Sequence, residues 1–484
     1  MKTAIITIIN EVNVKISNLD LDIRRKLVKK YEVEKPGARF LPSVKLGRWN
    51  GKVSYFSIGG ATYVTLLEEI IEEIINHGYD IELVDQRQPH PPFNFNKVDE
   101  NVFAHKVWPP DHQYEGKPVI ARDYQISLVN NLLADPQSMV ISATGSGKSL
   151  VTAILSHSIE KYGRSIIIVP SKNLVEQTEE YYINLGLDSG VYFGDRKDHD
   201  KQHTICTWQS LNALLKNTAN GTAEISIQEF IKDVVCVIVD EAHSIKAEVL
   251  TTLLNDTFGQ VPIRWGFTGT LPKDKFGQMA LLTSIGPVVG ELQASELQER
   301  GILAKCHVNI KQFKDNIEYK DYQSELKYLL ETEKRLDKIA AMIIEISKSG
   351  NTLVLIDRIT PGKNLTSKIK DSVFVSGVTK LSERKEEYND IKTSDNKVII
   401  ASYGVAAVGL DIPRIFNLVL IEPGKSFVRV IQSIGRGLRI ASDKDEVQIW
   451  DFTSTAKFSK RHLTARKAFY DESNYPYSIE KINI

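Results

Sequence analysis

Three segments place side chains at spacings that suit the chemistry of a nucleoside triphosphate. The first has the sequence Ala143-Thr144-Gly145-Ser146-Gly147-Lys148-Ser149. Its glycines let backbone N–H groups wrap a phosphate, Lys148 can reach the β- and γ-phosphates, and Ser149 can bind Mg²⁺. The strict phosphate-loop pattern has glycine where this chain has Ser142. The assignment therefore depends on the expected strand before the loop and the expected helix after it.

The second segment, Asp240-Glu241-Ala242-His243, follows the apolar run Val234–Val239. That run predicts a buried strand, so the two carboxylates emerge at the strand end where α/β sheets bind ligands. We expect Asp240 to hold Mg²⁺ and Glu241 to position and deprotonate an attacking water. A solvated acidic turn is the alternative.

The third segment has the sequence Gln432-Ser433-Ile434-Gly435-Arg436-Gly437-Leu438-Arg439. Arg436 and Arg439 are three residues apart and would share one face of a helix. Guanidinium groups match phosphate oxygens and keep their charge. An arginine supplied by a second lobe can stabilise the charge that develops on a γ-phosphate. A surface basic helix is the alternative for this segment alone.

Short apolar runs that alternate with helical patterns must position these side chains. This alternation predicts parallel sheets covered on both faces. The predicted division is a small α+β domain (1–88), a Pro-rich linker or wrap (89–118), an α/β domain (119–285), an inter-lobe linker (286–305), a second α/β domain (306–455) and a basic C-terminal tail (456–484).

The composition limits the possible functions. Hydrophobic residues make up 42% of the 484 residues, and 61 basic residues balance 61 acidic ones. Zero net charge argues against a generally basic nucleic-acid protein, so phosphate binding must come from local patches. One such patch lies between Arg24 and Lys52, with ten Lys/Arg against two Glu. Three dispersed cysteines without metal-ligand spacing, and the lack of a long apolar run, predict an intracellular, cytoplasmic protein with no membrane partner.

Further segments complete an ordered series together with those above. They are Ala121-Arg122-Asp123-Tyr124-Gln125, Pro170–Gln177, Thr207–Leu211, Thr268-Gly269-Thr270 and Ala401–Pro413. The series resembles the full motif set of superfamily 2 helicases and translocases, in order, over residues 121–439. The resemblance implies two RecA-like domains of the P-loop NTPase type and the cofactors ATP and Mg²⁺.

The resemblance also implies residue roles. Arg122 and Gln125 would contact adenine, and Thr268 and Thr270 would couple the ATP site to the nucleic-acid site. Gly409 and Asp411 would lie at the ATP cleft between the lobes. Gln432, Arg436 and Arg439 would complete the catalytic set at the γ-phosphate, with Arg439 as the arginine finger. The expected nucleic-acid track consists of segments around Ser171, Thr207, Gln209, Arg358 and Ser402.

The N-terminal segments Arg39-Phe40-Leu41-Pro42 and Gly47-Arg48-Trp49-Asn50-Gly51-Lys52 resemble the N-terminal domain of phage UvsW-type helicases. Those proteins are recombination and branch-migration motors. The resemblance implies branched or forked DNA and DNA–RNA hybrids as substrates, 3′ to 5′ polarity, and recombination or single-strand-binding proteins as partners. We expect a monomer. The interleaved basic and aromatic residues suit a surface that follows phosphates, namely Arg39, Lys45, Arg48, Trp49 and Lys52. A solvated basic turn with Trp49 in the core is the alternative.

Other interpretations stay open. An RNA-acting helicase, or the translocating subunit of a restriction system, would share the same motifs. A binding protein with an inactive ATP site is disfavoured by the intact Lys148, Asp240, Glu241 and Arg439. A second basic patch could touch a duplex or form a solvated C-terminal helix, and it comprises Lys457, Lys460, Arg461, His462, Arg466 and Lys467.

Overall fold

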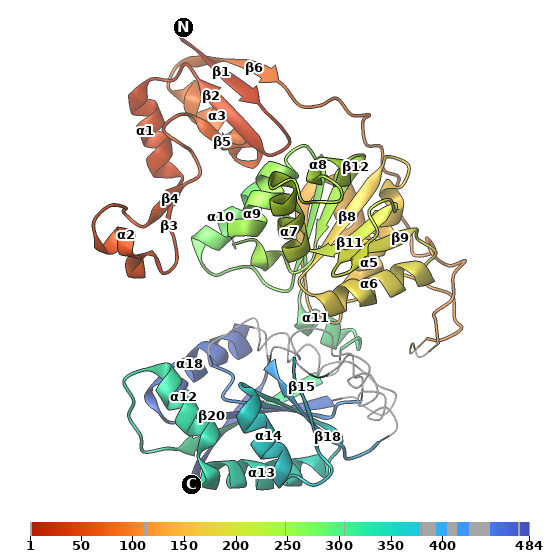
Figure 1. Ribbon diagram of the computed structural model, residues 1–484, viewed down its shortest axis with the longest axis vertical. Helices are drawn as coiled ribbons and strands as arrows, with labels where there is room; N and C mark the ends of the chain where they lie inside the picture. Colours follow the sequence, from red (N-terminus) through yellow and green to blue (C-terminus); the bar gives the residue numbers. More distant parts are fainter. Residues whose placement is uncertain are drawn as a thin grey trace. The chain divides into compact units, whose positions relative to one another are not determined.

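The computed structural model describes residues 2–483 apart from 111, 113, 247, 304, 378, 380–393, 404–413, 425–445 and 473–474. The chain divides into two compact units (Figure 1). The first is Met1–Ser142 with Gly147–Glu291, and the second is Ala143–Ser146 with Leu292–Ile484. The predicted fold class is confirmed, because each unit contains a largely parallel sheet and an α/β region precedes the first one. No described helix is long and apolar enough to cross a bilayer.

The N-terminal domain is a four-stranded sheet with two helices packed on one face. The strand order is β5-β2-β1-β6. Alternate residues of β1, namely Ala4, Ile6 and Ile8, point into the core because side chains alternate along a strand. The bounds are β1 (Lys2–Ile8), β2 (Asn13–Ser17), β5 (Ala61–Tyr63), β6 (Tyr79–Asp85), α1 (Leu21–Lys30) and α3 (Leu67–Asn76).

A projection that we call the α2 arm (residues 35–51) leaves this domain between β3 (Glu32–Glu34) and β4 (Lys52–Ser54). These two strands pair antiparallel. The arm contains a short 3₁₀ turn, η1 (Ala38–Phe40), and the single-turn helix α2 (Pro42–Lys45). Figure 1 shows α2 standing off from the four-stranded sheet.

The N-terminal domain is packed directly on the first α/β domain. The N–H of Glu11 donates to the carbonyl of Gly259 (2.9 Å), and Asn13 Nδ2 donates to the carbonyl of Asn255 (2.7 Å). Apolar side chains of the neighbouring helix α10 (Lys275–Ser284) extend the N-terminal core, namely Phe276, Met279 and Leu282. The chain from 89 to 118 then wraps over the α/β domain, where Phe95 lies 6.2 Å from Trp265 between ring centroids. Both contacts bind the parts of the first unit together.

The sheet of the first unit has the order β10-β9-β11-β8-β12-β13-β7-β14. The apolar runs Met139–Ser142, Ser165–Val169, Thr204–Thr207, Val234–Val239 and Arg264–Thr268 predicted strands, and these coincide with β7, β8, β11, β12 and β13. Strands β9, β10 and β14 were not predicted. The strand bounds are β7 (Gln137–Ser142), β8 (Arg164–Val169), β9 (Ser189–Phe193), β10 (Arg196–Lys197), β11 (His203–Thr207), β12 (Val234–Val239), β13 (Ile263–Thr268) and β14 (Val288–Leu292). The longer helices are α4 (Asp123–Ala134), α5 (Lys148–Ile159), α6 (Lys172–Asn184) and α7 (Trp208–Ala219).

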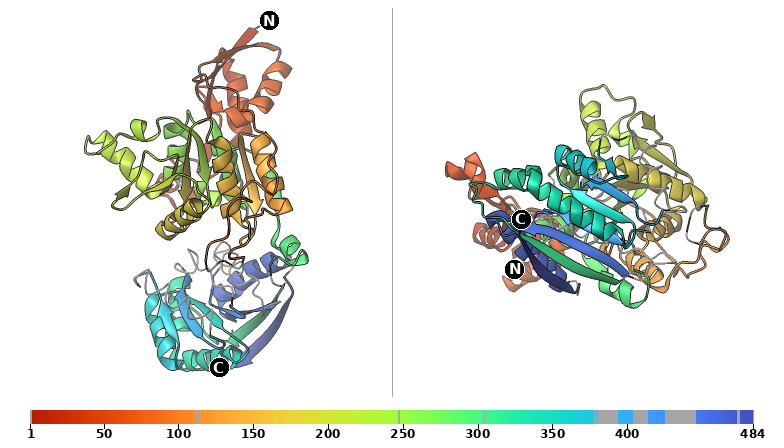
Figure 2. Two further views of the ribbon diagram at one scale, coloured as in Figure 1. Left: turned by 90° about the vertical axis from the view of Figure 1, so that its right-hand side faces the viewer. Right: turned by 90° about the horizontal axis from the view of Figure 1, so that it is seen from below.

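The sheet of the second unit has the order β17-β18-β16-β19-β20-β15-β21. The strands are β15 (Lys305–Lys314), β16 (Thr352–Ile356), β17 (Val373–Val375), β18 (Val398–Ser402), β19 (Asn417–Ile421), β20 (Glu446–Ser454) and β21 (Tyr477–Asn483). One face is covered by α12 (Tyr322–Glu331), α13 (Glu333–Ser347) and α14 (Ile359–Lys368). On β20, Phe452 packs in the core on that face, whereas Asp451 bonds to Arg466 of α18 (Lys457–Glu472) on the other. Figure 2 gives two further views of the sheet and its helices.

The C-terminal segment 456–484 differs from the predicted basic tail. Helix α18 packs on the sheet, and β21 adds a strand beside β15. Arg466 is buried and forms a two-pronged ion pair with Asp451, and His462 is also buried. These two residues therefore serve the fold of the second unit, and a wholly solvated helix is excluded.

Candidate functional site

Three neighbouring strand ends bring the predicted ATP-site segments of the first unit together. Strands β12, β13 and β7 are adjacent and parallel, with Val239 opposite Gly266 and Gly266 opposite Met139. Asp240, Thr268 and the loop after Ser142 therefore leave the sheet at one edge. This is the carboxyl edge, where open α/β sheets hold their ligands.

Lys148 is the first residue of α5, and its side chain reaches the acidic segment. Its Nζ donates to Glu241 Oε1 and to the carbonyl of Ser142, each at 3.5 Å. Gly145 and Gly147 have φ of +86° and +84°, which side-chain-bearing residues rarely adopt. A helix N-terminus with this backbone suits a phosphate. Thr144 is half-buried and Ser146 is buried. Both lie in the stretch Ala143–Ser146, which belongs to the second compact unit.

The two adjacent carboxyl groups are held in different electrostatic states. Burial raises the pKa of Asp240, against the attraction of Lys148. Burial acts in the same sense on Glu241, but Lys148 and the hydrogen bond with His243 outweigh it and hold the pKa of Glu241 below its usual range. Glu241 also has a left-handed φ of +51°, a strained conformation for a residue with a side chain. An ionised Glu241 is the state that a general base requires.

His243 connects the acidic segment to the next motif, a link that the motifs alone did not predict. Its Nδ1 lies 3.3 Å from Glu241 Oε2 and 3.3 Å from Thr268 Oγ1. Thr268 Oγ1 in turn donates to the carbonyl of Thr270 at 2.8 Å. The sequence signal for this link was the histidine that ends the segment Asp240-Glu241-Ala242-His243. A continuous polar chain thus runs from Lys148 to Thr270.

Gln125 packs against the phosphate loop as well as capping its own helix. Its Oε1 accepts the N–H of Arg122 at 2.8 Å, at the start of α4. A Cβ at Gly147 would lie only 2.3 Å from Gln125 Nε2, so this contact needs glycine. Arg122 Nη1 donates to Tyr124 Oη at 3.0 Å, and its Nη2 reaches Tyr114 Oη at 3.4 Å. Tyr114 is an addition to the predicted adenine-side residues.

The donor set at this edge fits Mg²⁺. Ser149 offers a hydroxyl, and Asp240 accepts the N–H of Glu241 through Oδ1 (2.9 Å) while retaining a second carboxylate oxygen. Mg²⁺ prefers oxygen ligands and commonly takes only one or two of them from protein, with phosphates and water supplying the rest.

Two family models match the chain, the Type III restriction enzyme res subunit over residues 119–273 and the helicase conserved C-terminal domain over residues 334–441. The chain belongs to the superfamily 2 helicases. It is 24% identical over 477 residues to the ATP-dependent DNA helicase uvsW of Enterobacteria phage T4, covering 93% of this chain and 91% of that protein. As a member of this family, the helicase uses ATP.

Two solved structures share the helicase fold. The ATP-dependent type ISP restriction-modification enzyme LlaBIII bound to DNA matches with a TM-score of 0.56 and 16% identity, covering 86% of this chain and 34% of that one. Dbp5 of S. cerevisiae bound to RNA and ADP BeF3 matches with a TM-score of 0.53 and 16% identity, covering 75% and 90%. Both show the fold alone.

The helicase carries three predicted track residues in one cleft of the first unit. Ser171 and Thr207 start α6 and α7, where their hydroxyls accept the N–H groups of Leu174 and Ser210. Gln209 lines the same cleft, whose volume is about 680 Å³. The lining residues include Pro170, Ser171, Lys172, Tyr192, Lys197, Thr207, Gln209 and Ser210. Two helix N-termini at one cleft favour an anionic ligand.

The other two predicted track residues lie in the second unit of the helicase. Arg358 follows β16 and Ser402 ends β18, a strand paired with β16. Arg358 has a left-handed φ of +68° and donates through Nη2 to Gln323 Oε1 at 2.7 Å. Gly409, Asp411, Gln432, Arg436 and Arg439 lie outside the described residues.

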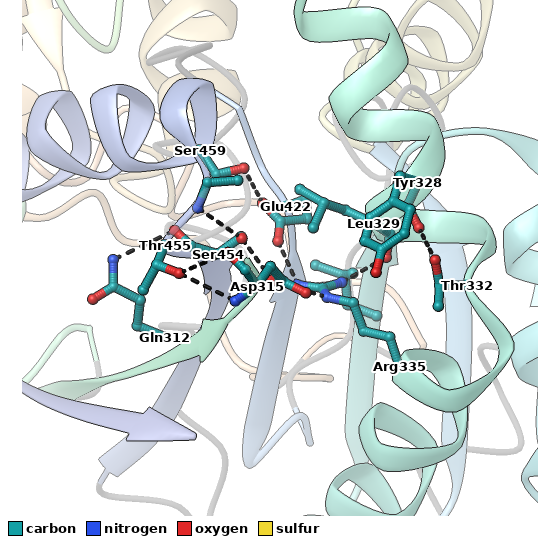
Figure 3. Close-up of polar contacts among 12 residues, drawn as sticks. Gln312, Asp315, Tyr328, Leu329, Thr332, Arg335, Glu422, Ser454, Thr455 and Ser459 are labelled. Carbon is teal, nitrogen blue, oxygen red and sulfur yellow. Dashed lines mark hydrogen bonds and ion pairs between the residues drawn. The ribbon is translucent and has the colours of Figure 1, made fainter. Parts of the chain in front are cut away.

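A buried network of charged and polar side chains surrounds Glu422, the residue directly after β19 (Figure 3). Arg335 is fully buried and donates to Glu422 Oε1 and to the carbonyl of Leu329, each at 2.6 Å, and its Nε lies 3.5 Å from Asp315 Oδ2. Ser459 donates to Glu422 Oε2 at 2.9 Å. Burial raises the pKa of Glu422 to about 7, although Arg335 opposes this. The network therefore fixes the chain at Glu422, directly after β19 in the second unit.

The predicted N-terminal residues all lie on the α2 arm or at its base. Arg39, Lys45 and Arg48 are exposed. Trp49 is half-buried, and its Nε1 donates to the carbonyl of Lys52 at 2.9 Å. Lys52 pairs with Glu32 at 3.1 Å. Trp49 therefore fastens the arm and lies outside the core of the domain.

Proposed function

We propose that this helicase is an ATP-driven DNA motor that unwinds or branch-migrates forks, four-way junctions, D-loops and R-loops, moving 3′ to 5′ along one strand. The observation that carries the choice of substrate is the basic α2 arm on the same unit as the ATP site. Three exposed cations, Arg39, Lys45 and Arg48, have no ion-pair partner among the described residues. A phosphate backbone would supply that partner.

The ATP-site residues divide the work of hydrolysis. Lys148 and the loop N–H groups bind the phosphates, and Glu241 accepts the proton of the attacking water. Ser149 and Asp240 would hold Mg²⁺, which would neutralise charge on the phosphates. Arg122 and Gln125 hold the adenine. By the resemblance to the family, Gln432, Arg436 and Arg439 act on the γ-phosphate, and Arg439 is the arginine finger. Gly409 and Asp411 belong to the same ATP cleft.

Coupling to DNA follows the chain from Glu241 through His243 to Thr268. A change at the γ-phosphate alters the charge around Glu241, and His243 touches both Glu241 and Thr268. The cleft at Ser171, Thr207 and Gln209 then grips the backbone, and Arg358 and Ser402 supply the contacts of the second lobe. Because phosphate contacts carry no base information, we expect a preference for DNA shape over DNA sequence.

The test compares the wild type with the variant Arg39→Ala/Lys45→Ala/Arg48→Ala on a synthetic four-way junction and on linear duplex DNA. Deleting residues 1–88 is a poorer test because it would expose the apolar side chains of α10 that the domain covers. The matched control removes three exposed lysines from the second unit, Lys327→Ala/Lys334→Ala/Lys338→Ala.

We expect ATP-dependent opening of the junction by the wild type and the control. The arm variant should lose about tenfold or more in junction affinity, with a smaller dependence on salt, because three phosphate contacts are removed. Equal junction affinity for the arm variant and the control would contradict the role of the arm. Greater stimulation of ATP hydrolysis by structured RNA than by branched DNA would contradict DNA as the substrate.

A further inference from the structure

The tip of the α2 arm exposes large apolar side chains. Phe40 is 63% exposed, Leu46 65% and Leu41 39%, all within seven positions of the chain. Burying one such side chain is worth about 1.5–3 kcal/mol, so a cluster left in water marks a surface that meets a partner. These residues flank the single turn of α2, with Leu41 before it and Leu46 after it.

The arm is an ordered structure, so its tip keeps its shape. The N–H of Lys35 donates to the carbonyl of Gly51 (2.9 Å), which closes the base of the arm. The N–H groups of Arg48 and Trp49 donate to the carbonyl of Ser43 (2.9 and 3.2 Å). Ala38, within the arm, is buried, so the exposure of Phe40 does not come from an unfolded loop.

Charge identifies the kind of partner. Residues 35–52 contain five basic residues and no acidic one. The Arg39 guanidinium lies 4.8 Å from the centre of the Phe40 ring. A cation against an aromatic face, with phosphate-binding cations around it, suits a nucleic-acid base with its backbone. A second copy of the arm would bring like charges together, and a purely apolar partner would leave the cations without compensation.

The arm is fixed to the motor. Tyr55, one residue after β4, is buried, and its hydroxyl donates to the carbonyl of Phe276 on α10 at 3.2 Å. The base of the arm therefore lies against the first α/β domain, which also carries Lys148 and Glu241. DNA drawn along that domain would be pulled against a stationary tip.

We propose that Phe40, assisted by Leu46, is the strand-separating wedge of this helicase, stacking on the base pair at the branch point. This inference rests on the proposed DNA function. Arg39, Lys45 and Arg48 hold the two backbones while the apolar tip replaces the stacking partner of the terminal pair.

The test uses full-length Phe40→Ala/Leu46→Ala, with Leu83→Ala as the matched control because Leu83 is 59% exposed on β6 of the same domain. A forked duplex carries 2-aminopurine at the branch-point pair. We expect the wild type and the control to raise its fluorescence on binding, and the double variant to leave it near the level of free DNA. Unwinding by the double variant should fall about tenfold, in line with the loss of base stacking, while DNA-stimulated ATP hydrolysis stays within about twofold. Phe40→Trp should restore unwinding because an aromatic face is retained.

Three results would overturn the wedge. They are unwinding by Phe40→Ala/Leu46→Ala at the wild-type rate, an equal loss in Leu83→Ala, and a wild-type dimer in sedimentation that the double variant converts to a monomer. Failure of the underlying DNA function would look different, because the wild type itself would then show no DNA-stimulated ATP hydrolysis.

Discussion

Lys148 Nζ lies 3.5 Å from Glu241 Oε1. This pair joins the residue proposed to bind phosphate to the residue proposed to activate water, and Lys148 helps to hold Glu241 in its charged form. Lys148→Ala should abolish ATP turnover and weaken nucleotide binding. Glu241→Gln should retain nucleotide binding but lose about 10²–10⁴-fold in kcat, as expected for removal of a general base.

Steady-state ATP hydrolysis and binding of a fluorescent ATP analogue measure the two effects separately. Lys232→Ala, at an exposed lysine of the same unit, is the control and should behave as the wild type. Unchanged turnover in Lys148→Ala would refute the site assignment.

The raised pKa of Asp240 predicts a stability cost in the absence of nucleotide and Mg²⁺. Because the folded protein holds this proton more tightly than the unfolded chain, stability falls as pH rises from about 4 to about 6 and stays lower above that. Asp240→Asn should therefore be more stable than the wild type by about 1–3 kcal/mol near pH 8.

Melting curves measured at about pH 4 and about pH 8 test this effect. The advantage of Asp240→Asn should shrink at the lower pH, where the wild-type carboxyl is protonated. If Asp240→Asn melts below the wild type at both pH values, the raised pKa of Asp240 is not the cause of the stability difference. Loss of ATP turnover is expected in either case.

Gln125 predicts a joint effect on nucleotide use and on stability. Gln125→Ala removes the hydrogen bond from the N–H of Arg122 and leaves space beside Gly147. We expect a loss of about 0.5–2 kcal/mol, typical of a helix cap, together with a higher KM for ATP. Since the predicted contact is with adenine, the KM for GTP should change much less. Equal changes in the two KM values would exclude a base-specific role.

Arg335 predicts a pH-dependent defect in the second unit. Arg335→Met leaves Glu422 and Asp315 buried without the cation that pairs with both, which should cost about 3–5 kcal/mol near pH 8. Because burial raises the pKa of Glu422, its ionised form is disfavoured, and stability falls as pH rises from the ordinary range of a glutamate toward about 7. The defect should therefore be smaller near pH 5.

The double variant Arg335→Met/Glu422→Gln separates charge from packing. It should recover part of the lost stability near pH 8, because the buried charge of Glu422 is removed while Asp315 still lacks Arg335. If the double variant is as unstable as Arg335→Met at both pH values, the loss comes from packing against Phe313 and Leu329 and the charge network is not its cause.

The sequence predicted the parts of the fold that depend on local pattern. Val234–Val239 is a buried apolar run and coincides with β12. In contrast, β15 and β21 were missed because their residues alternate or are mostly polar, which is typical of strands near a sheet edge. These two strands lie together at one edge of the sheet of the second unit, where the sequence pattern is weaker than in its centre.

Side-chain roles were predictable where a motif defines them and not where distant chain segments meet. Nothing in the sequence indicates that Arg335 is fully buried, because its ion-pair partners Asp315 and Glu422 come from other elements. Trp49 and Phe40 look equivalent in a basic aromatic stretch, but only the packing of the arm shows that Trp49 is pinned and Phe40 exposed.

The most direct test of an ATP-driven DNA motor is the opening of a synthetic four-way junction, followed over time with ATP and Mg²⁺, by the wild type and by Glu241→Gln. We expect the wild type to open the junction only when ATP is present, while Glu241→Gln binds the junction and ATP but does not open it. Opening by Glu241→Gln at the wild-type rate, or no ATP-dependent opening by the wild type, would contradict the proposed motor function.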